Sequence, residues 1–472
     1  MTSGAGTTRG YFDRLWDLHE IRDLGAGRSL LAIDRIFLHE RTGSVALEEL
    51  ARRGRSVRAP ARTFCTMDHI VDTLPGRGDV TRVPGGTAFI LATRRAAQAA
   101  GLRTFDLGDP QQGIVHVIAP ELGLVLPGAS VACPDSHTAT QGALGALAFG
   151  IGSSEAEHAL ATGTLRVRRP AALRIRIDGR TAAPVTAKDL ALALIARLGA
   201  AGAAGRAIEY CGSAIAALPM EARMTLCNLS AELSAVTAVI APDDTTFEYV
   251  AARPLAPRGA LWEQALQHWR LLSGEDAGSP ADIVFDAAQL APMVTWGTSP
   301  AQAVPVDGAV PEPAGDAAAR GAHARAIAYM GLAPGTALGD LPIDGAFIGS
   351  CTNGRLSDLR DAARVLEGRR VAPGVRAICV PGSTEVKHAA EAEGLDRIFV
   401  AAGFEWRESG CSMCFYAGGE SFGPRQRVVS STNRNFESRQ GPETRTHLAS
   451  PATVAASAVL GRIADVRKLG RH

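Results

Sequence analysis

Several features that define whole protein classes are scarce in this 472-residue chain. No uninterrupted apolar run reaches the roughly 18 residues that a membrane-spanning helix needs. The eight cysteines are too few for a disulfide scaffold in a chain of this length. Net charge is also small, because 49 basic and 48 acidic residues leave a formal charge of +1. These absences argue against a membrane protein, a disulfide-stabilised domain and a protein that binds nucleic acid through its overall charge.

Lysine is nearly absent, since the chain contains only Lys188, Lys387 and Lys468 and its other basic residues are arginines. We interpret this preference for arginine over lysine as a consequence of a GC-rich genome. The first residues, MTSGAGTTRG and YFDRLWDLHE, include no apolar segment of signal-peptide length. A reducing compartment would keep sparse cysteines as thiols. We therefore expect a cytoplasmic protein.

Apolar residues make up 46% and charged residues 21% of the chain, as in ordinary globular proteins. Segments of helical period, such as TAKDLALALIARLG and RLSDLRDAARVLEG, alternate with short apolar runs bounded by turn residues. The runs that predict buried strands are GIVHVIAP (113–120), LVLPGASVAC (124–133), AFIGSC (346–351), VRAICVPGS (375–383) and RIFVAAG (397–403). The alternation predicts an α/β protein with mostly parallel sheets flanked by helices.

The length predicts about three domains at roughly 150 residues each. New strand signals open near Arg169 and give the first boundary. The segment 301–340 is rich in Pro, Ala and Gly and is the best candidate for a linker. We therefore expect domains at 1–168, 169–300 and 341–472, with the linker between the last two.

Three cysteines form the first candidate site. Cys411 and Cys414 are a Cys-x-x-Cys pair in GCSMC, and Cys351 lies far upstream in IGSCTNGR. Three thiolates brought together suit an iron–sulfur cluster with one incompletely ligated iron, which is a Lewis acid. A zinc site would need a fourth ligand, which Cys379 or a distant histidine could supply. A redox dithiol or a set of inert core thiols would also account for these cysteines.

Two motifs place an acid beside a histidine: TMDHIVD contains Asp68 and His69, and CPDSHTAT contains Asp135, Ser136 and His137. A carboxylate can orient an imidazole and raise its basicity, so that the ring exchanges protons near neutral pH. The same residue types are common in turns and helix N-caps, so a structural role is the alternative.

Polar residues elsewhere are candidates for substrate binding. Arg434 and Arg439 lie in the segment STNRNFESRQG, where each guanidinium can grip a carboxylate with two hydrogen bonds. They point to a di- or tricarboxylate substrate, unless they are ordinary surface arginines. Asn228 and Glu232 are four residues apart and share one face if their segment is helical, where they either line a site or bridge core elements.

Taken together and in this order, these motifs resemble those of the aconitase superfamily. The similarity runs nearly from end to end and includes LLAIDRIFLHE, QGIVHVIAPELG, DSHTATQGALGALAFGIGSSEAEH, VTWGTSP, AYMGLAPG and THLASP. Within the superfamily, the chain is most similar to large subunits that isomerise 2-isopropylmalate in leucine biosynthesis. The resemblance implies a three-domain aconitase-like fold that lacks the swivelling fourth domain of single-chain aconitases.

The resemblance also implies roles for the residues named above. Cys351, Cys411 and Cys414 would hold a 4Fe-4S cluster in which one iron has no cysteine ligand. The side chains expected in catalysis are Asp68, His69, Asp135 and His137, and those expected to bind substrate are Ser136, Asn228, Glu232, Arg434 and Arg439.

The implied reaction is that of a hydro-lyase, which converts 2-isopropylmalate into 3-isopropylmalate through isopropylmaleate by dehydration and rehydration. The resemblance further implies a small subunit as partner in a heterodimer, which carries the swivelling domain and a serine base. This chain alone is therefore expected to be inactive, and no nucleic acid is expected to bind.

Several positions depart from the family pattern and leave the substrate open. The segment Phe415 to Ser421 is unusual, Ser438 and Pro134 stand where glycine is usual, and Ile70 replaces an asparagine. These changes favour a paralogue that acts on another 2-substituted malate, such as homoaconitate, citramalate or a specialised-metabolite analogue. The aromatic pair of Phe415 and Tyr416 either reshapes the pocket or packs on a helix.

The alternative from another class is an iron–sulfur sensor or RNA-binding protein without catalysis. Acid/base groups and carboxylate-binding arginines together favour an enzyme, because a cluster scaffold needs neither.

Overall fold

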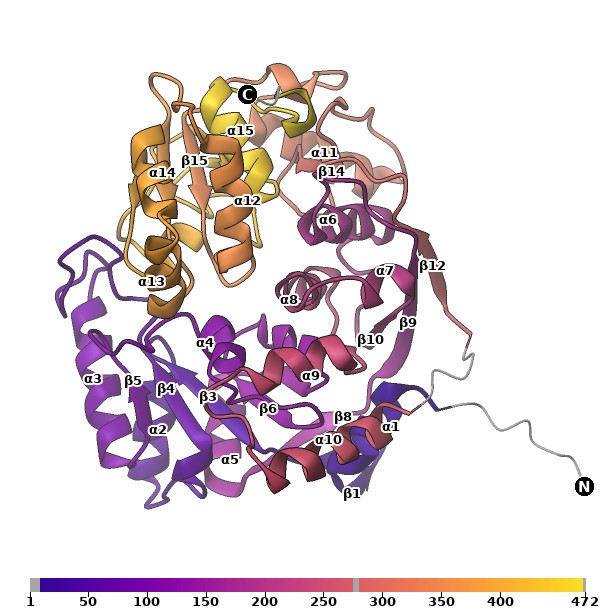
Figure 1. The fold of residues 1–472 in the computed structure, drawn as a ribbon, viewed down its shortest axis with the longest axis vertical. Coiled ribbons are helices and arrows are strands. Elements are labelled where there is room, and N and C mark those ends of the chain that lie inside the picture. Colours follow the sequence, from indigo (N-terminus) through magenta and orange to yellow (C-terminus); the bar gives the residue numbers. More distant parts are fainter. Residues whose placement is uncertain (1–8, 275–279, 470–472) are drawn as a thin grey trace, which may run out of the picture.

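The computed structural model describes residues 9–274 and 280–469. Three parallel sheets, each with helices around it, form three units. In Figure 1 the C-terminal unit lies above the first unit, the middle unit lies beside them, and α8 is near the centre. The expected α/β class with mostly parallel sheets is confirmed. Among the described residues, no helix combines the length and the apolar character that crossing a bilayer requires.

The first unit contains a parallel sheet in the order β5-β4-β3-β6-β7. Its strands are β3 (Arg35–His39), β4 (Thr63–Thr66), β5 (Arg103–Phe105), β6 (Ser130–Cys133) and β7 (Leu147–Gly150). Its helices are α1 (Tyr11–His19), α2 (Gly43–Arg52), α3 (Gly86–Ala99), α4 (Val115–Glu121) and α5 (Ser153–Thr162), with the 3-10 helices η1 (Pro60–Arg62) and η2 (Thr138–Leu144). A small antiparallel sheet consists of β1 (Glu20–Gly25), β2 (Arg28–Ala32) and β8 (Thr164–Arg168).

The middle unit contains a parallel sheet in the order β11-β10-β9-β12. Its strands are β9 (Ala171–Asp178), β10 (Arg206–Cys211), β11 (Thr237–Ile240) and β12 (Ile283–Asp286). Its helices are α6 (Ala187–Leu198), α7 (Ser213–Ala216), α8 (Met220–Leu229), η3 (Ser230–Leu233), α9 (Asp244–Ala251) and α10 (Ala260–Ser273).

The segment after the middle unit is folded. An antiparallel pair is formed by β13 (Met293–Thr295) and β14 (Ala303–Pro305), and α11 (Ala317–Met330) and η4 (Leu338–Asp340) follow. The residues 301–340 expected to form a linker therefore contain a strand and a long helix, whose N-cap is the Asp316 side chain. Domain boundaries at 168, 300 and 341 remain a prediction.

The C-terminal unit contains a parallel sheet in the order β17-β16-β15-β18-β19. Its strands are β15 (Gly345–Ile348), β16 (Arg376–Cys379), β17 (Phe404–Trp406), β18 (Arg427–Ser430) and β19 (Arg445–Leu448). Its helices are α12 (Leu356–Leu366), α13 (Thr384–Ala392), α14 (Leu395–Ala402), η5 (Ser412–Cys414), α15 (Pro451–Leu460) and η6 (Val466–Lys468).

Two of the expected strands are helices. Most of the run 113–120 lies in α4, and all of the run 397–403 except Gly403 lies in α14. In α14 the buried residues Leu395, Phe399 and Ala402 follow helical spacing, while Val400 is 57% exposed. A short apolar run does not distinguish a buried strand from a helix that packs on one side, and here packing against the sheets decides for the helix.

The first and C-terminal sheets have the same topology. Numbered along each unit, the strand order is 3-2-1-4-5 in both, so the chain reverses direction across the sheet between β3 and β6 and between β15 and β18. Side chains at the carboxyl ends of strands at such a switch point face a shared crevice. The topology therefore predicts a site at each of these two edges.

Main-chain hydrogen bonds join these two units. The N–H of Ile114 donates to the carbonyl of Gly382 at 2.8 Å, and the N–H of Thr384 donates to the carbonyl of Gln112 at 2.8 Å. Gly113 lies between them, and a Cβ there would meet Ser383 Cα at 2.6 Å. Only glycine permits this approach, which fixes the two sheet edges relative to each other.

Candidate active site

The three candidate cysteines lie at the carboxyl edge of the C-terminal sheet and are buried as free thiols. Cys351 follows β15, and Cys411 and Cys414 follow β17. Asn433 lies between two of them, because its Nδ2 is 3.5 Å from Cys351 Sγ and its Oδ1 is 3.6 Å from Cys414 Sγ. Ser350 Oγ is 3.3 Å from Cys414 Sγ and 3.9 Å from Cys351 Sγ. The fold thus brings thiols from remote segments to one place.

The loops that carry these cysteines are strained and are tied to the first unit. The φ angles of Ser350 and Ser412 are 86° and 49°, values that residues other than glycine rarely adopt. Thr73 Oγ1 donates to Ser412 Oγ at 2.8 Å, and the N–H of Cys411 donates to the carbonyl of Asp68 at 2.8 Å. Such conformations persist where the surroundings over-determine them, as they do here.

His69 lies where the first unit meets Cys411. Its Nδ1 is 2.6 Å from Asp68 Oδ1, and its Nε2 is 3.2 Å from Asp135 Oδ2. Burial alone would lower the pKa of His69, but Asp68, Cys411 and the hydrogen bond to Asp135 raise it well above its usual value. The surroundings therefore favour the protonated ring.

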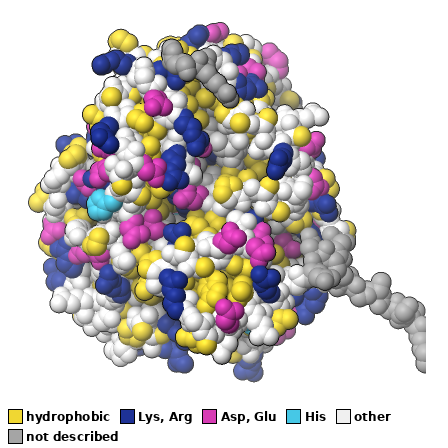
Figure 2. Space-filling model, in the orientation of Figure 1, with side chains coloured by type: hydrophobic (Ala, Val, Ile, Leu, Met, Phe, Trp, Pro, Cys, Tyr) yellow, Lys and Arg dark blue, Asp and Glu magenta, His cyan; other side chains and the backbone are white. Residues whose placement is uncertain are grey.

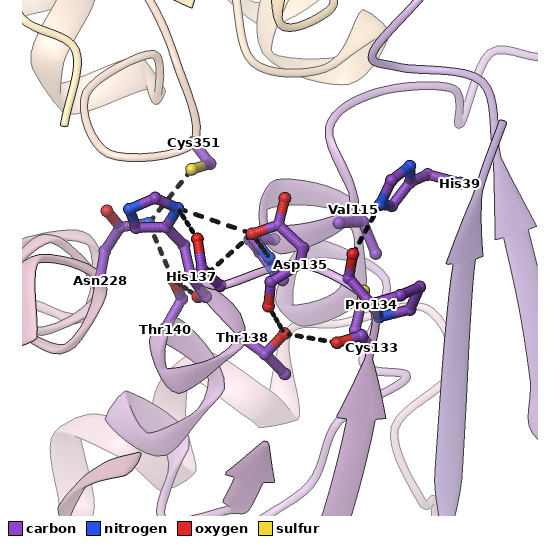
Figure 3. A network of polar contacts seen from close by, with 12 residues as sticks. His39, Val115, Cys133, Pro134, Asp135, His137, Thr138, Thr140, Asn228 and Cys351 are labelled. Atoms are coloured by element: carbon purple, nitrogen blue, oxygen red, sulfur yellow. Dashed lines mark hydrogen bonds and ion pairs between the residues drawn. The ribbon is translucent and has the colours of Figure 1, made fainter. Parts of the chain in front are cut away.

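Asp135 follows β6 and contacts several histidines, of which Figure 3 shows His137. Besides contacting His69, its carboxylate accepts the N–H of His137 at 2.7 Å and lies 3.1 Å from His116 Nε2. Burial would raise the pKa of Asp135, but its histidine neighbours lower it well below the usual value. Asp135 therefore favours its carboxylate form, which can hold the neighbouring rings in place.

His137 continues this network toward the arginine segment. Its Nε2 is 2.9 Å from Glu232 Oε1, which also accepts a hydrogen bond from Arg434 Nε at 2.8 Å. Arg434 Nη1 donates to Ser136 Oγ at 3.0 Å. Burial favours the neutral acid, but His137 and Arg434 keep the pKa of Glu232 below its usual value. The network holds the Arg434 guanidinium through Nε and Nη1 and leaves further N–H groups to bind an anion.

Asn228 connects the middle unit to Cys351. Its Nδ2 is 2.9 Å from Thr140 Oγ1 and 3.2 Å from Cys351 Sγ, and its Oδ1 accepts the hydroxyl of Thr352 at 2.8 Å. Asn228 lies at the end of α8, and Glu232 lies in η3, which follows directly. Both side chains reach the same site, as the helical spacing predicts.

Arg439 lies beside Cys414, with its Nη2 4.0 Å from the sulfur, and among aromatic rings. Its guanidinium carbon is 5.6 Å from the ring centre of Phe415 and 5.0 Å from that of Phe436. Its buried Nε has no hydrogen-bond partner among the described residues. Phe415 is nearly buried with its ring centre 5.7 Å from that of His69, whereas Tyr416 is 37% exposed. Phe415 therefore faces the site, and Arg439 has a donor free for a ligand.

Two residues that the sequence analysis did not name also lie at the site, beside Asp68 and His69. His39 stacks on His69 with ring centres 4.0 Å apart, and Glu40 accepts the N–H groups of Asp68 and His69 at 3.0 and 2.7 Å. Burial and the nearby Asp68 charge raise the pKa of Glu40 to about 7, and burial lowers the pKa of His39 to about 4. Glu40 thus acts as an anchor for the main chain around Asp68, and His39 is a neutral ring.

The distances distinguish between the possible roles of the thiols. A tetrahedral zinc would place its thiolate sulfurs about 3.8 Å apart, given Zn–S bonds of about 2.3 Å. Among the described residues, the side chains whose ligand atoms all lie within 4.8 Å of one another are His39, Glu40, Asp68 and His69. The three thiols are not among them, so their sulfur atoms do not all lie within 4.8 Å of one another, which is wider than a single zinc ion needs.

The thiols also lack the character of a redox dithiol. Burial raises the pKa of Cys351 to about 12 and that of Cys411 well above its usual value. Reactive dithiols are partly exposed and have lowered pKa values. Buried thiols become thiolates at neutral pH when metal ions offset the cost of the charge, so these residues fit a metal cluster.

Comparison with known proteins identifies the family. The model of the aconitase family (aconitate hydratase) matches residues 13–461. The chain belongs to the aconitase family. The 3-isopropylmalate dehydratase large subunit 1 of Bradyrhizobium diazoefficiens is 54% identical over 462 residues, which are 97% of this chain and 96% of that protein. Among solved structures, the holo-form of Thermococcus kodakaraensis aconitase X aligns with a TM-score of 0.46 and 12% identity over 97% of this chain and 93% of its own.

Membership of the aconitase family implies a 4Fe-4S cluster, and the three thiols fit it. The motifs found in the sequence converge on this place, because every candidate side chain named above lies in or beside one hydrogen-bonded network. Among the missed residues, His116 is concealed in a run that resembled a strand. His39 and Glu40 did have a signal, since they are a polar pair directly after the buried run IFL.

Proposed function

We propose that this chain is the large, cluster-bearing subunit of a hydro-lyase that isomerises 2-isopropylmalate to 3-isopropylmalate through isopropylmaleate. The observation that carries the proposal is the meeting of the Cys411 thiol with His69, a proton-bearing ring held between Asp68 and Asp135. The Bradyrhizobium relative, whose name states this activity, supports the choice of substrate.

In this proposal, Cys351, Cys411 and Cys414 hold a 4Fe-4S cluster in which one iron has no cysteine ligand. When bound, such a cluster supplies a Lewis acid for the hydroxyl group that departs from the substrate. Asn433 and Asn228 orient the sulfur atoms by donating N–H groups to Cys351.

The proton for the departing hydroxyl comes from His69. Its Nε2 is the nitrogen that faces Asp135, and Asp68 holds the ring through Nδ1. Giving up this proton lets water leave instead of hydroxide, which lowers the barrier. Asp135 stays anionic throughout and keeps His116 and His137 in position for proton exchange.

The two arginines bind the carboxylates of the substrate. Arg434 is oriented by Glu232 and Ser136, and Arg439 presents an unpaired N–H beside the thiols. A guanidinium that neighbouring side chains already hold loses little conformational freedom when it binds a carboxylate. This favours a fixed orientation of the diacid.

The proton on carbon needs a base, for which we propose a serine on a separate small subunit that carries the swivelling domain. The name of the Bradyrhizobium relative, a large subunit, supports such a partner. On the face drawn in Figure 2, acidic and basic side chains are interspersed, so that face offers no basic stripe to RNA.

The direct test is reconstitution of the chain with iron and sulfide without oxygen, followed by addition of a 3-isopropylmalate dehydratase small subunit. We expect a brown protein that hydrates isopropylmaleate only when both subunits are present. A colourless protein that contains zinc would contradict the cluster and the mechanism.

A second candidate keeps the chemistry and changes the acid. Phe415 lies against His69, and the Arg41 guanidinium carbon is 5.0 Å from its ring centre, so the pocket has an aromatic wall with a cation at its rim. The same assay with unsaturated precursors of homoisocitrate and methylmalate decides between the two. Conversion of one of these alone, and not of isopropylmaleate, would establish the paralogue.

A further inference from the structure

Lys188 is an exception to the composition of the chain. It is fully buried, although nearly every other basic residue is an arginine. It also stands in the first turn of α6, where the helix dipole disfavours a positive charge. Burial lowers the pKa of its ammonium to about 8, which leaves it charged at neutral pH. Neither helix formation nor burial explains a lysine here, so its contacts must.

The ammonium reaches out of the middle unit into the C-terminal unit. Lys188 Nζ donates to the carbonyl of Ser431 at 3.0 Å and to the carbonyl of Thr432. These are the last two peptide groups before Asn433, whose amide lies between Cys351 and Cys414. Arg434 follows and binds Glu232.

Acidic side chains and one thiol lie near this ammonium, and none of them forms a direct ion pair with it in the contacts described. Asp358, followed by Cys414, Glu232 and Asp189, partly offsets the effect of burial on the pKa of Lys188. Cys414 is one of the proposed cluster ligands, so the ammonium lies near the proposed cluster site. A compact ammonium with three N–H donors suits a closed space lined by carbonyls, whereas a planar guanidinium is larger.

We propose that Lys188 is a positioning residue for the cluster, which holds Asn433 and Arg434 in register through the carbonyls of Ser431 and Thr432 and places a buried ammonium near Cys414. The inference rests on the proposed function, because it takes the three cysteines to be cluster ligands. Lys188 touches neither substrate nor cluster and acts through the 431–434 segment.

The experiment compares Lys188→Met with wild type and with Lys468→Met, a change of an exposed lysine in η6. Each protein is reconstituted anaerobically, and iron content, the rate of iron loss on oxidation and the EPR spectrum of the oxidised cluster are measured. A 3-isopropylmalate dehydratase small subunit is then added for the measurement of kcat and KM. Residues that orient metal ligands typically affect metal affinity or activity by about 10- to 100-fold. We expect iron loss in Lys188→Met to be faster by about this factor, with an altered EPR spectrum and a raised KM, and no change in Lys468→Met.

Asn433→Ala gives a readout that a merely structural role would not move. If Lys188 acts through Asn433, the double variant loses cluster no faster than the more affected single variant, because the two changes remove one interaction. If Lys188→Met does not fold, Lys188→Gln, which keeps N–H donors without charge, takes its place under the same criteria.

Wild-type rates of iron loss and an unchanged EPR spectrum in the Lys188 variant would overturn this inference alone. Independent, multiplicative effects of the Lys188 and Asn433 changes would also overturn it. A wild-type protein that takes up no cluster would overturn the proposed function as well, so the two failures are distinguishable.

Discussion

The first and C-terminal units have the same sheet topology, but the side chains that they contribute to the site differ in chemistry. Each has a parallel sheet in the order 3-2-1-4-5, and in each the carboxyl ends of the strands beside the switch point line the site. The first unit contributes carboxylates and imidazoles, such as Asp135 and His69, whereas the C-terminal unit contributes sulfur, amide and guanidinium groups. The shared fold fixes where side chains meet, and the loops decide what they do there.

The middle unit sharpens this contrast. Its four strands follow the same order as the first four of the other sheets, yet their ends supply none of the side chains of the site described above. Asn228 and Glu232 come instead from the end of α8 and from η3, and they join the two chemical halves. A common topology is therefore not sufficient for a site.

Replacing a cluster thiol should have the largest effect. Cys351→Ser is expected to lose the cluster and to lower activity by about 10³-fold or more, because metal-ion stabilisation of a leaving group is worth several kcal/mol. The matched control is Cys211→Ser, at the end of a strand of the middle sheet, which should retain iron and activity. If Cys351→Ser retained as much iron as Cys211→Ser, Cys351 would not be a ligand of the cluster.

Replacing the proposed proton donor should separate the two halves. His69→Gln is expected to lower kcat by about 10²- to 10⁴-fold, the usual worth of general acid catalysis, while iron and sulfide content stay at the wild-type level. The exposed His268→Gln serves as control, with kinetics and iron analysis as measurements. Loss of the cluster in His69→Gln would contradict the division of roles between the units.

Disturbing the contact between the two units should have a moderate effect. In Gly113→Ala the new methyl group would meet main-chain atoms of Ser383 and Gly382, so the units must move apart. Forced overpacking of this kind costs about 1–3 kcal/mol of unfolding free energy. Gly78→Ala, where a Cβ meets open space, should cost much less. Thermal unfolding compares them, and equal stabilities would contradict the close approach.

Acid should weaken the protein through histidines that are buried without charge. His447 in β19 accepts a hydrogen bond from Arg427 Nη1 at 2.7 Å, and burial, followed by the charge of Arg427, lowers its pKa to about 3. The contribution of His447 to the free energy of unfolding is therefore complete above about pH 6.5, the pKa of histidine in the unfolded chain. It is lost as the pH falls toward 3, because over this range only the unfolded chain takes up the proton.

The expected loss is about 1.4 kcal/mol for each pH unit below 6.5. Thermal unfolding of wild type and His447→Gln between about pH 7 and pH 5.5 measures it, with the exposed His268→Gln as control. His447→Gln should depend less on pH than wild type. Equal slopes would place the acid sensitivity elsewhere.

The chemistry of the site could be predicted from the sequence because its groups stand in short motifs. Cys411 with Cys414 and Asp68 with His69 are candidates from spacing, their roles are implied by the resemblance of the whole set to one family, and the structure brings them together. The α/β class follows from alternating apolar runs and helical periods. Local patterns suffice where one segment carries both the residues and the turn that presents them.

The remaining parts depend on contacts between distant segments. His116 could not be placed while α4 was expected to be a strand, and Lys188 looked like an ordinary residue of a helical period. Lys188 and the carbonyl of Ser431 are 243 residues apart in the chain. No local pattern encodes such a pairing, so its meaning appears only when the middle and C-terminal units are assembled.

Mössbauer spectroscopy of the chain reconstituted with iron-57 and combined with a small subunit tests the central claim most directly. If the cluster held by the thiols of the C-terminal unit has one iron without a cysteine ligand, and this iron faces the acid/base side chains of the first unit, adding isopropylmalate should change the signal of one iron in four. Signals of all four irons that stay unchanged while substrate is being converted would contradict this claim.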